Sequence, residues 1–510
     1  MERSPVSHVY SNRVDEVLSR TAGRVPDRVA ITFAERSWTY RELEDAVTAG
    51  AADLLDRGVR PGDRVATYGR NSDAYVIAFL ACARAGLIHV PINYALTGDE
   101  LAYLITDSGA ALVLADADLL GNVAELGLTA VAVLRDGPAA FLDAVVGAGL
   151  GVAFTPAPAD AELAQLLYTS GTTSAPKGAM MSHRALVHEY VSCIVAFGMH
   201  ETDEPLHAMP LYHSAGMHVW MLPYLAVGAT NHLIAAPEVP VILEQIEARR
   251  AGAIFLAPTV WVPLSQHPDF AMRDLSSLRK AVYGASIMPV PVLARIAAAL
   301  PDLGFYNAFG QSEIGPLATV LAPAEHAERP ASCGRAVLNV EVAVHDPDGA
   351  PVPPGQMGEV VYRSPQLCDG YWNKPEATAD AFRDGWFRSG DLVIADAQGY
   401  ITVVDRIKDV VNTGGVLVAS REVEDALYTH EAVAEVAVVG VPDDKWIEAI
   451  AAFVVAKKEV SADELITHAK GQLAGYKVPK SVVFVDALPR NASGKLLKRV
   501  IRDDYAESSA

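Results

Sequence analysis

A run of hydroxyl-bearing residues and glycines between Thr169 and Gly178 holds the side chains best suited to chemistry in this chain. The run reads TSGTTSAPKG, with Lys177 near its end. Glycines let backbone N–H groups turn inward, threonine and serine hydroxyls donate further hydrogen bonds, and Lys177 adds a full positive charge. Such a loop can hold a polyphosphate, although the GxxxxGK[ST] spacing of a Walker loop is absent. A flexible polar linker is the alternative for a loop of this composition taken alone.

The elements around the loop predict an α/β fold. An apolar strand is expected to end at Tyr168, and Ser182 is a good N-cap for a helix that follows the loop. Upstream, Thr39 and Glu42 form a capping-box pattern at the start of a helix. Strands expected at 65–68, 88–92 and 111–115 alternate with helices at 74–85 and 98–107, and the pattern resumes at 253–256 and 281–283. This alternation favours parallel or mixed sheets covered by helices.

One domain boundary is expected in the last third of the chain, after a small β-rich subdomain. After the turn-rich segment PVPPGQMG, short strands at 358–363, 386–392 and 400–405 indicate a small β-rich subdomain. Beyond it, helices and strands alternate in an α+β unit of about a hundred residues, an ordinary domain size. We therefore predict a large N-terminal domain, 1–405, and a small, mobile α+β C-terminal domain, 406–510.

Composition and charge exclude several classes of protein. Of 510 residues, 51% are hydrophobic and 20% charged, so the chain can bury large cores. The net charge of −21 argues against a nucleic-acid partner, because such binding needs clustered Lys and Arg. Four scattered cysteines without a CxxC pattern indicate reduced thiols in a cytoplasmic protein. The longest uncharged stretch, 219–236, contains proline, glycine, asparagine and histidine, so we expect buried core and no membrane span.

The segment 166–182, LLYTSGTTSAPKGAMMS, closely resembles the phosphate-binding signature of the adenylate-forming superfamily. That superfamily includes acyl-CoA synthetases, aryl-CoA ligases and the adenylation domains of nonribosomal peptide synthetases. Five or more ordered motifs are far more specific than one glycine-rich loop. Those that follow in the family's order are YGAS at 283–286, YNAFGQSEIG at 306–315, WFRSGDL at 386–392, DRIK at 405–408, GGVLVASREVE at 414–424 and PRNASGK at 489–495.

The resemblance implies a nucleotide site built from these motifs. Phe309 would stack on adenine, Ser312 would contact a phosphate oxygen and Glu313 would hold Mg²⁺, which prefers carboxylate and phosphate oxygens. Asp391 would accept hydrogen bonds from both ribose hydroxyls. Lys495 would lie between the attacking carboxylate and the α-phosphate. The remaining residues implied to contact ATP or AMP are Thr169, Ser170, Gly171, Thr172, Thr173, Lys177, Gly284, Ala285, Ser286, Asn307, Ala308, Gly310 and Arg406.

Further positions are implied for the acid and for the acceptor. His213, in PLYHSAG, would be a catalytic gate at the mouth of the carboxylate pocket, with Trp220 and Trp261 as candidate pocket wall. Ordinary core packing is the alternative for each of these three side chains. Lys408 falls at the family's hinge position, and Gly414 and Gly415 would line the path of the acceptor thiol. The next two residues, Val416 and Leu417, are apolar where the family usually has a polar pair.

The activity implied is that of an ATP-dependent, AMP-forming carboxylate ligase. It would convert a small-molecule fatty or aryl acid to an acyl-adenylate and then to a CoA thioester, with ATP, Mg²⁺ and CoA, while the C-terminal domain alternates between two positions. A second hypothesis passes the adenylate to an amine, a carrier-protein thiol or nitrite for diazotisation. A third, a catalytically silent relative, is disfavoured by Lys495, Glu313 and Asp391.

Overall fold

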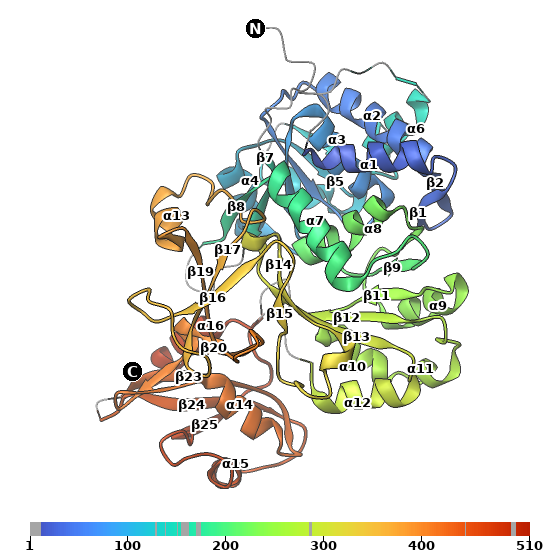
Figure 1. Cartoon of the computed structure of the whole chain (residues 1–510). Helices are drawn as coiled ribbons and strands as arrows, with labels where there is room; N and C mark the ends of the chain where they lie inside the picture. The colour runs from blue at the N-terminus through green and yellow to red at the C-terminus, as the bar shows by residue number, and fades with distance from the viewer. Residues whose placement is uncertain are drawn as a thin grey trace. The chain divides into compact units, whose positions relative to one another are not determined.

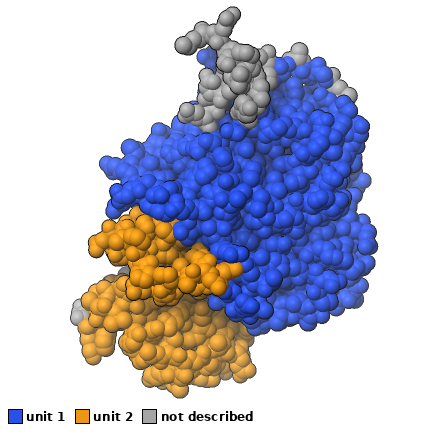
Figure 2. Space-filling model, viewed as in Figure 1, with its two compact units in different colours: residues 1–169, 176–342, 362–387 blue, residues 170–175, 343–361, 388–510 orange. Residues whose placement is uncertain are grey.

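The computed structural model describes residues 12–127, 130–137, 139–149, 151–152, 154, 163–169, 175–284, 288–443, 445–490 and 496–509. The chain divides into two compact units, which Figure 2 distinguishes by colour. The first unit takes residues 1–169, 176–342 and 362–387. The second takes residues 170–175, 343–361 and 388–510. The fold is α/β, as the sequence predicted.

A six-stranded sheet in the first unit carries the hydroxyl-rich loop. Its strand order is β6-β5-β3-β4-β7-β8, and every pair is parallel except the hairpin of β7 and β8. Helices α1, α2, α3 and α6 gather beside this sheet (Figure 1). The elements are α1 (Val14–Arg24), α2 (Tyr40–Asp56), β3 (Arg64–Tyr68), α3 (Asp73–Ala85), β4 (Ile88–Ile92), α4 (Gly98–Ser108), β5 (Ala110–Ala115), α5 (Leu120–Ala124), β6 (Val131–Val133), α6 (Phe141–Ala148), β7 (Leu163–Thr169), β8 (Lys177–Ser182) and α7 (His183–Phe197).

A nine-stranded sheet completes the core of the first unit. Its order is β15-β14-β13-β12-β11-β9-β10-β1-β2, parallel from β13 to β1 and antiparallel at both edges. Helices α10, α11 and α12 lie beside β12 and β13 (Figure 1). The elements are β1 (Val29–Phe33), β2 (Arg36–Thr39), β9 (Pro205–His207), η3 (Ala215–Met221), α8 (Leu222–Val227), β10 (Asn231–Leu233), α9 (Val239–Arg249), β11 (Ala253–Phe255), α10 (Pro258–Gln266), α11 (Asp269–Met272), β12 (Lys280–Gly284), α12 (Val290–Ala299), β13 (Gly304–Gly310), η4 (Ser312–Ile314), β14 (Leu317–Leu321) and β15 (Arg335–Ala336).

Local sequence signals explain where several of these helices begin and end. The Thr39 side chain accepts from the Glu42 N–H while the Glu42 carboxylate accepts from the Thr39 N–H, so the predicted capping box is confirmed. The Ser182 hydroxyl accepts from Ala185 and starts α7. Gly86 ends α3 in the left-handed conformation that glycine adopts without strain.

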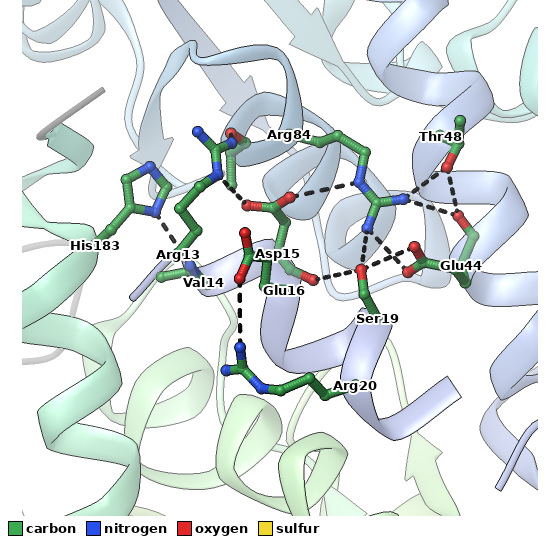
Figure 3. Close-up of polar contacts among 11 residues, drawn as sticks. Arg13, Val14, Asp15, Glu16, Ser19, Arg20, Glu44, Thr48, Arg84 and His183 are labelled. Atoms are coloured by element: carbon green, nitrogen blue, oxygen red, sulfur yellow. Dashed lines mark hydrogen bonds and ion pairs between the residues drawn. The ribbon is translucent and has the colours of Figure 1, made fainter. Parts of the chain in front are cut away.

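A buried ionic network fastens α1 to α2 and α3. The Arg84 guanidinium, on α3, reaches the Asp15 carboxylate at 3.5 Å, the Ser19 hydroxyl at 2.9 Å and the Thr48 hydroxyl at 2.7 Å (Figure 3). It also meets the Glu44 carboxylate at 2.9 Å. Both Arg84 and Asp15 side chains are only 4% exposed. A buried charge is stable only when it is paired and hydrogen-bonded. The packing of α1 against α2 and α3 therefore depends on this network.

The long uncharged segment is core, as expected. It forms the end of η3, all of α8 and strand β10, and most of its side chains are buried. In the part of the chain that the structure describes, no helix is long and apolar enough to cross a membrane.

The second unit holds most of the β-rich sheet and the C-terminal α+β fold. The β-rich sheet has the order β16-β17-β19-β18 with β20 on β19, and the division between the units passes through its strands. The predicted boundary at 405–406 therefore stays a prediction. Helix α16 was not predicted from the sequence. Helix α13 (Pro375–Ala381) and strand β18 (Phe382–Arg383) belong to the first unit. The other elements of this part of the chain are β16 (Glu341–His345), β17 (Met357–Arg363), β19 (Trp386–Ala395), β20 (Ile401–Arg406), β21 (Val411–Thr413), β22 (Val416–Val418), α14 (Ser420–Tyr428), β23 (Val433–Asp443), β24 (Ile447–Ala456), α15 (Ala462–Lys470), β25 (Ser481–Phe484) and α16 (Lys498–Ser509).

Candidate active site

The hairpin of β7 and β8 presents the predicted phosphate loop. Thr169 and Lys177 face each other in the last register pair of this hairpin, and the Thr169 hydroxyl donates to the Lys177 carbonyl at 3.4 Å. The Lys177 ammonium lies 5.1 Å from the centre of the Tyr371 ring, a cation–π contact. The predicted contacts of Ser170, Gly171, Thr172 and Thr173 lie outside the described residues.

Glu313 lies on the short helix η4, immediately after β13. Its side chain is nearly buried, and the Tyr371 hydroxyl donates to its Oε1 at 2.9 Å. Burial, and then the Glu313 charge, raise the pKa of Tyr371, so the hydroxyl stays protonated and remains a donor. Among the described residues the Glu313 carboxylate has no ion-pair partner. A nearly buried carboxylate with one neutral donor and a free oxygen fits a hard divalent cation such as Mg²⁺.

The adenine-side motifs fall on neighbouring strands, β12 and β13. Gly284 and Ala308 pair in register, and a Cβ on Gly284 would lie 2.4 Å from the Ala308 carbonyl oxygen. A Cβ on Gly310 would lie 2.0 Å from the Pro316 carbonyl oxygen. At both positions a side chain would collide with a neighbouring backbone carbonyl, so only glycine fits. The sequence alone did not reveal this reason for the two glycines. Asn307 donates to the Ser332 carbonyl at 3.1 Å, Phe309 is partly exposed, and Ala285 and Ser286 lie outside the described residues.

The predicted acid-side residues begin next to this nucleotide-side group. The hydroxyls of Ser214 and Ser312 lie 3.1 Å apart, so PLYHSAG and the motif of Glu313 are neighbours. His213 accepts from the Ala215 N–H at 3.1 Å and thereby helps to start η3. Trp220 and Trp261 are each 1% exposed, which agrees with core packing. Their roles at the acid pocket, and that of His213, stay predictions.

Tyr371 was missed by the sequence reasoning. No local pattern marks it, because it contacts Lys177 and Glu313 across 194 and 58 positions of the chain, respectively, and each separation is set only by the fold. The nearest signal was the aromatic pair that it forms with Trp372 after a glycine.

In the second unit, the structure brings together two residues that were predicted to contact the nucleotide. Asp391 on β19 pairs in register with Arg406 on β20, and the Arg406 Nε lies 2.7 Å from the Asp391 Oδ1. Asp391 is nearly buried, whereas about a third of the Arg406 side chain is exposed. Lys408 follows in the short helix η6 (Ile407–Asp409), where burial and the Arg406 charge lower the pKa of its ammonium.

The predicted acceptor-side glycines form the turn between β21 and β22. Gly414 and Gly415 have φ of 65° and 82°, which an L side chain would strain, and the Gly414 N–H donates to the Trp446 carbonyl at 2.5 Å. The indole of Trp446 lies against Gly414, with the ammonium groups of Lys445 and Lys480 at 4.9 Å and 5.3 Å from the ring centre. The sequence reasoning also missed this aromatic and cationic group.

Two predictions on this side remain open. Val416 and Leu417 are 45% and 58% exposed, so the apolar departure from the family pattern lies at the surface of the second unit. Lys495 lies outside the described residues, and its predicted role stays a prediction.

Comparison with known proteins decides which family this arrangement represents. The model of a family described as "AMP-binding enzyme" matches residues 18–372, more than half of the chain. The chain belongs to the AMP-binding enzyme family. A second model, "AMP-binding enzyme C-terminal domain", matches residues 422–495 of this AMP-binding enzyme. The resemblance stated from the motifs is confirmed.

Relatives and solved structures match this AMP-binding enzyme over nearly its whole length. The feruloyl-CoA synthases of Amycolatopsis sp and Streptomyces sp are 39% identical to it over 485 residues, covering 95% of this chain and 97% of theirs. Indoleacetate–CoA ligase of Aromatoleum aromaticum is 32% identical, covering 97% of this chain and 99% of that protein. The crystal structure of ATP-bound MatB from Rhodopseudomonas palustris matches with a TM-score of 0.88 and 31% identity, covering 97% of this chain and 99% of that one. This AMP-binding enzyme is therefore an ATP-dependent, AMP-forming acid–CoA ligase.

Proposed function

We propose that this AMP-binding enzyme activates an aromatic acid whose ring is joined to the carboxylate by a short carbon chain, and transfers the acyl group to CoA. Feruloyl-CoA synthase, at 39% identity, and indoleacetate–CoA ligase, at 32%, are both named for acids of this kind. The acid is thus a small-molecule partner, and its class is narrower than the fatty or aryl acid expected from the motifs.

One observation in the structure carries the adenylation step. Tyr371 contacts Lys177 through its ring and Glu313 through its hydroxyl, so the loop lysine and the metal-type carboxylate belong to one cluster of the first unit. Lys177 would bind phosphate oxygens, and Glu313 would hold Mg²⁺, the cation usual in this family. When bound, Mg²⁺ would supply positive charge against the phosphates of ATP. Because phosphoryl transfer depends mainly on positioning and charge, this cluster supports the reaction without a Ser-His-Asp triad.

The two half-reactions place different demands on the protein. In the first, a carboxylate oxygen forms a bond to the α-phosphorus, the bond from that phosphorus to the bridging oxygen breaks, and pyrophosphate leaves. Lys495 would stabilise the charge on the α-phosphate oxygens. In the second, the CoA sulfur loses its proton and attacks the acyl carbon, and AMP leaves. We infer that the C-terminal region alternates about Lys408 between these steps.

Nucleotide and acceptor roles follow for the second unit. Asp391, oriented by Arg406, would accept hydrogen bonds from the ribose hydroxyls, since a carboxylate can accept two at once. Trp446, flanked by Lys445 and Lys480, would suit a nucleotide with phosphates, because the indole offers a stacking face and the ammonium groups offer charge. This group supports CoA as the acceptor.

We also infer a cytoplasmic location. None of the four cysteines, which all lie in the described part of the chain, forms a disulfide, and three of them are buried, which suits a reducing compartment.

A panel of acids tests the proposed function. Pyrophosphate release is measured with ferulate, cinnamate, indoleacetate, hexanoate, palmitate and malonate, and products are detected by mass with and without CoA. We expect the aryl acids to be turned over fastest and to appear as CoA thioesters. Fastest turnover of palmitate or malonate would contradict the acid class. Strong AMP release without a thioester, accelerated instead by an amine or by nitrite, would contradict the CoA acceptor.

A further inference from the structure

The segment 366–372, which we name the strap, fastens two distant parts of the first unit. Its backbone pairs with β8: the Met180 N–H donates to the Gly370 carbonyl at 2.9 Å, and the Trp372 N–H donates to the Gly178 carbonyl at 2.8 Å. The strap also pairs with η4, because the Cys368 N–H donates to the Glu313 carbonyl at 2.8 Å. The strand after the phosphate loop and the turn of Glu313 are therefore held by one short piece of backbone.

The start of the strap is fixed beneath the same turn. The Gln366 side-chain amide is fully buried and donates to the carbonyls of Ile314 and Leu317, at 3.2 Å and 3.1 Å. It also donates to the buried carboxylate of Glu189, which accepts from the Leu317 N–H at 3.0 Å. A satisfied buried network of this kind restricts the backbone on both sides of η4.

Tyr371 is the strap side chain that lies between the two charged groups. Its ring meets the Lys177 ammonium and its hydroxyl meets the Glu313 carboxylate. Among the described residues, neither Lys177 nor Glu313 forms an ion pair, with each other or with any other side chain. Within the part of the chain that the structure describes, both opposite charges therefore contact one neutral side chain and neither has a partner of opposite charge.

We propose that Tyr371 is a positioning residue for the adenylation step, whose hydroxyl orients the Glu313 carboxylate toward the cation and whose ring places the Lys177 ammonium toward the phosphates. This inference rests on the proposed function. Its physical basis is that a direct lysine–glutamate ion pair would have to be broken before each turnover, whereas a cation–π contact and a single hydrogen bond leave the ammonium hydrogens and one carboxylate oxygen available.

Two substitutions separate the two contacts of Tyr371. Tyr371→Phe removes only the hydroxyl, so it should weaken binding of a nonhydrolysable ATP analogue about tenfold when Mg²⁺ is present, the effect of losing one hydrogen bond to a charged group. In the absence of Mg²⁺ the affinity should be unchanged. Tyr371→Leu also removes the ring. Its affinity for the analogue should be roughly threefold lower than that of Tyr371→Phe, both with and without Mg²⁺. Both affinities are measured by titration calorimetry.

A double-mutant cycle tests whether the hydroxyl acts through Glu313. With Glu313→Gln already present, Tyr371→Phe should have almost no additional effect on Mg²⁺-dependent binding, because the carboxylate that it orients is gone. The matched control is Tyr40→Phe, which removes the hydroxyl of another buried tyrosine that donates to the Ala229 carbonyl at 2.8 Å. The control should bind the analogue like the wild type. In turnover assays Tyr371→Phe should lower kcat of pyrophosphate release and leave KM for the acid unchanged.

The outcomes distinguish this inference from the proposed function. Additive effects of Tyr371→Phe and Glu313→Gln would overturn the positioning role. Loss of the folded state in Tyr371→Phe, with Tyr40→Phe folded, would also overturn it, in favour of a purely structural role. Failure of the wild type to release pyrophosphate with any acid would instead contradict the proposed function, while the binding cycle would still decide the role of Tyr371.

Discussion

Acidification should destabilise this AMP-binding enzyme through four buried histidines. Burial lowers the pKa of His89, His207 and His218 to about 3, and lowers that of His183 to about 4 with help from the Arg13 charge. Two of them belong to one buried chain of hydrogen bonds. The His89 and His218 rings both meet the Gln165 amide, at 2.9 Å and 2.7 Å. If either imidazole were protonated, its positive charge would be shielded from water and would face the Gln165 amide, which carries no negative charge.

The sign and size follow from proton linkage. The pKa of each histidine is lower in the folded state than the value of about 6.5 in the unfolded state. As the pH falls below about 6.5, the unfolded chain therefore takes up protons that the folded chain does not, and the unfolding free energy decreases until the pH reaches the folded pKa values. Each histidine costs about 0.2 kcal/mol of unfolding free energy at about pH 7 and about 1.4 kcal/mol at about pH 5.5, so the four together remove about 5 kcal/mol over this interval. Burial raises the pKa of Glu189, which offsets part of this loss.

Calorimetry in buffers of different ionisation enthalpy measures the protons taken up on unfolding. At about pH 5.5 the variant His218→Gln should take up about 0.9 proton fewer than the wild type, because the unfolded wild-type imidazole is about nine-tenths protonated there. Glutamine can still donate to Gln165 and accept from Tyr190, so the fold should persist. The control is Gln356→Ala at an exposed side chain that carries no ionisable group, for which we expect an unchanged uptake. Equal uptake by His218→Gln and the wild type would refute the reasoning.

Three further predictions concern single side chains. Arg84→Met should lower the unfolding free energy by about 1–3 kcal/mol in urea titrations, because it removes the hydrogen bonds to Ser19 and Thr48 and leaves Arg13, at 3.1 Å, as the ion-pair partner of the buried Asp15 carboxylate; a change below about 0.5 kcal/mol would contradict the importance of the network. Asp391→Ala should raise the KM for ATP far more than that for the acid, and equal effects on both would argue against ribose binding. Lys495→Ala should slow adenylation about 10²- to 10³-fold, the scale of losing one preorganised donor, while thioester formation from pre-made adenylate survives; equal loss in both half-reactions would contradict its assigned role.

Much of the fold could be predicted because its signals are local. The capping box of Thr39 and Glu42, the glycine after α3 and the Ser182 cap each depend on residues within a few positions of one another. The alternation of strands and helices indicated α/β sheets for the same reason, since each element needs only its own period of apolar residues. The ordered motifs identified the family, which the two family models confirm. They also indicated the reaction, which agrees with the relatives named as CoA ligases.

Contacts between distant residues were decided only by the tertiary structure. Asp391 and Arg406 were each assigned to the nucleotide from their motifs, but their ion pair depends on the register of β19 with β20. Gly310 was expected to contact the nucleotide, yet the group that would clash with a Cβ there is the Pro316 carbonyl. Tyr371 had no motif of its own. Its place between Lys177 and Glu313 depends on how the strap pairs with β8 and η4. Hydrogen bonds between residues far apart in the sequence are set by tertiary packing, which no local pattern of residues encodes.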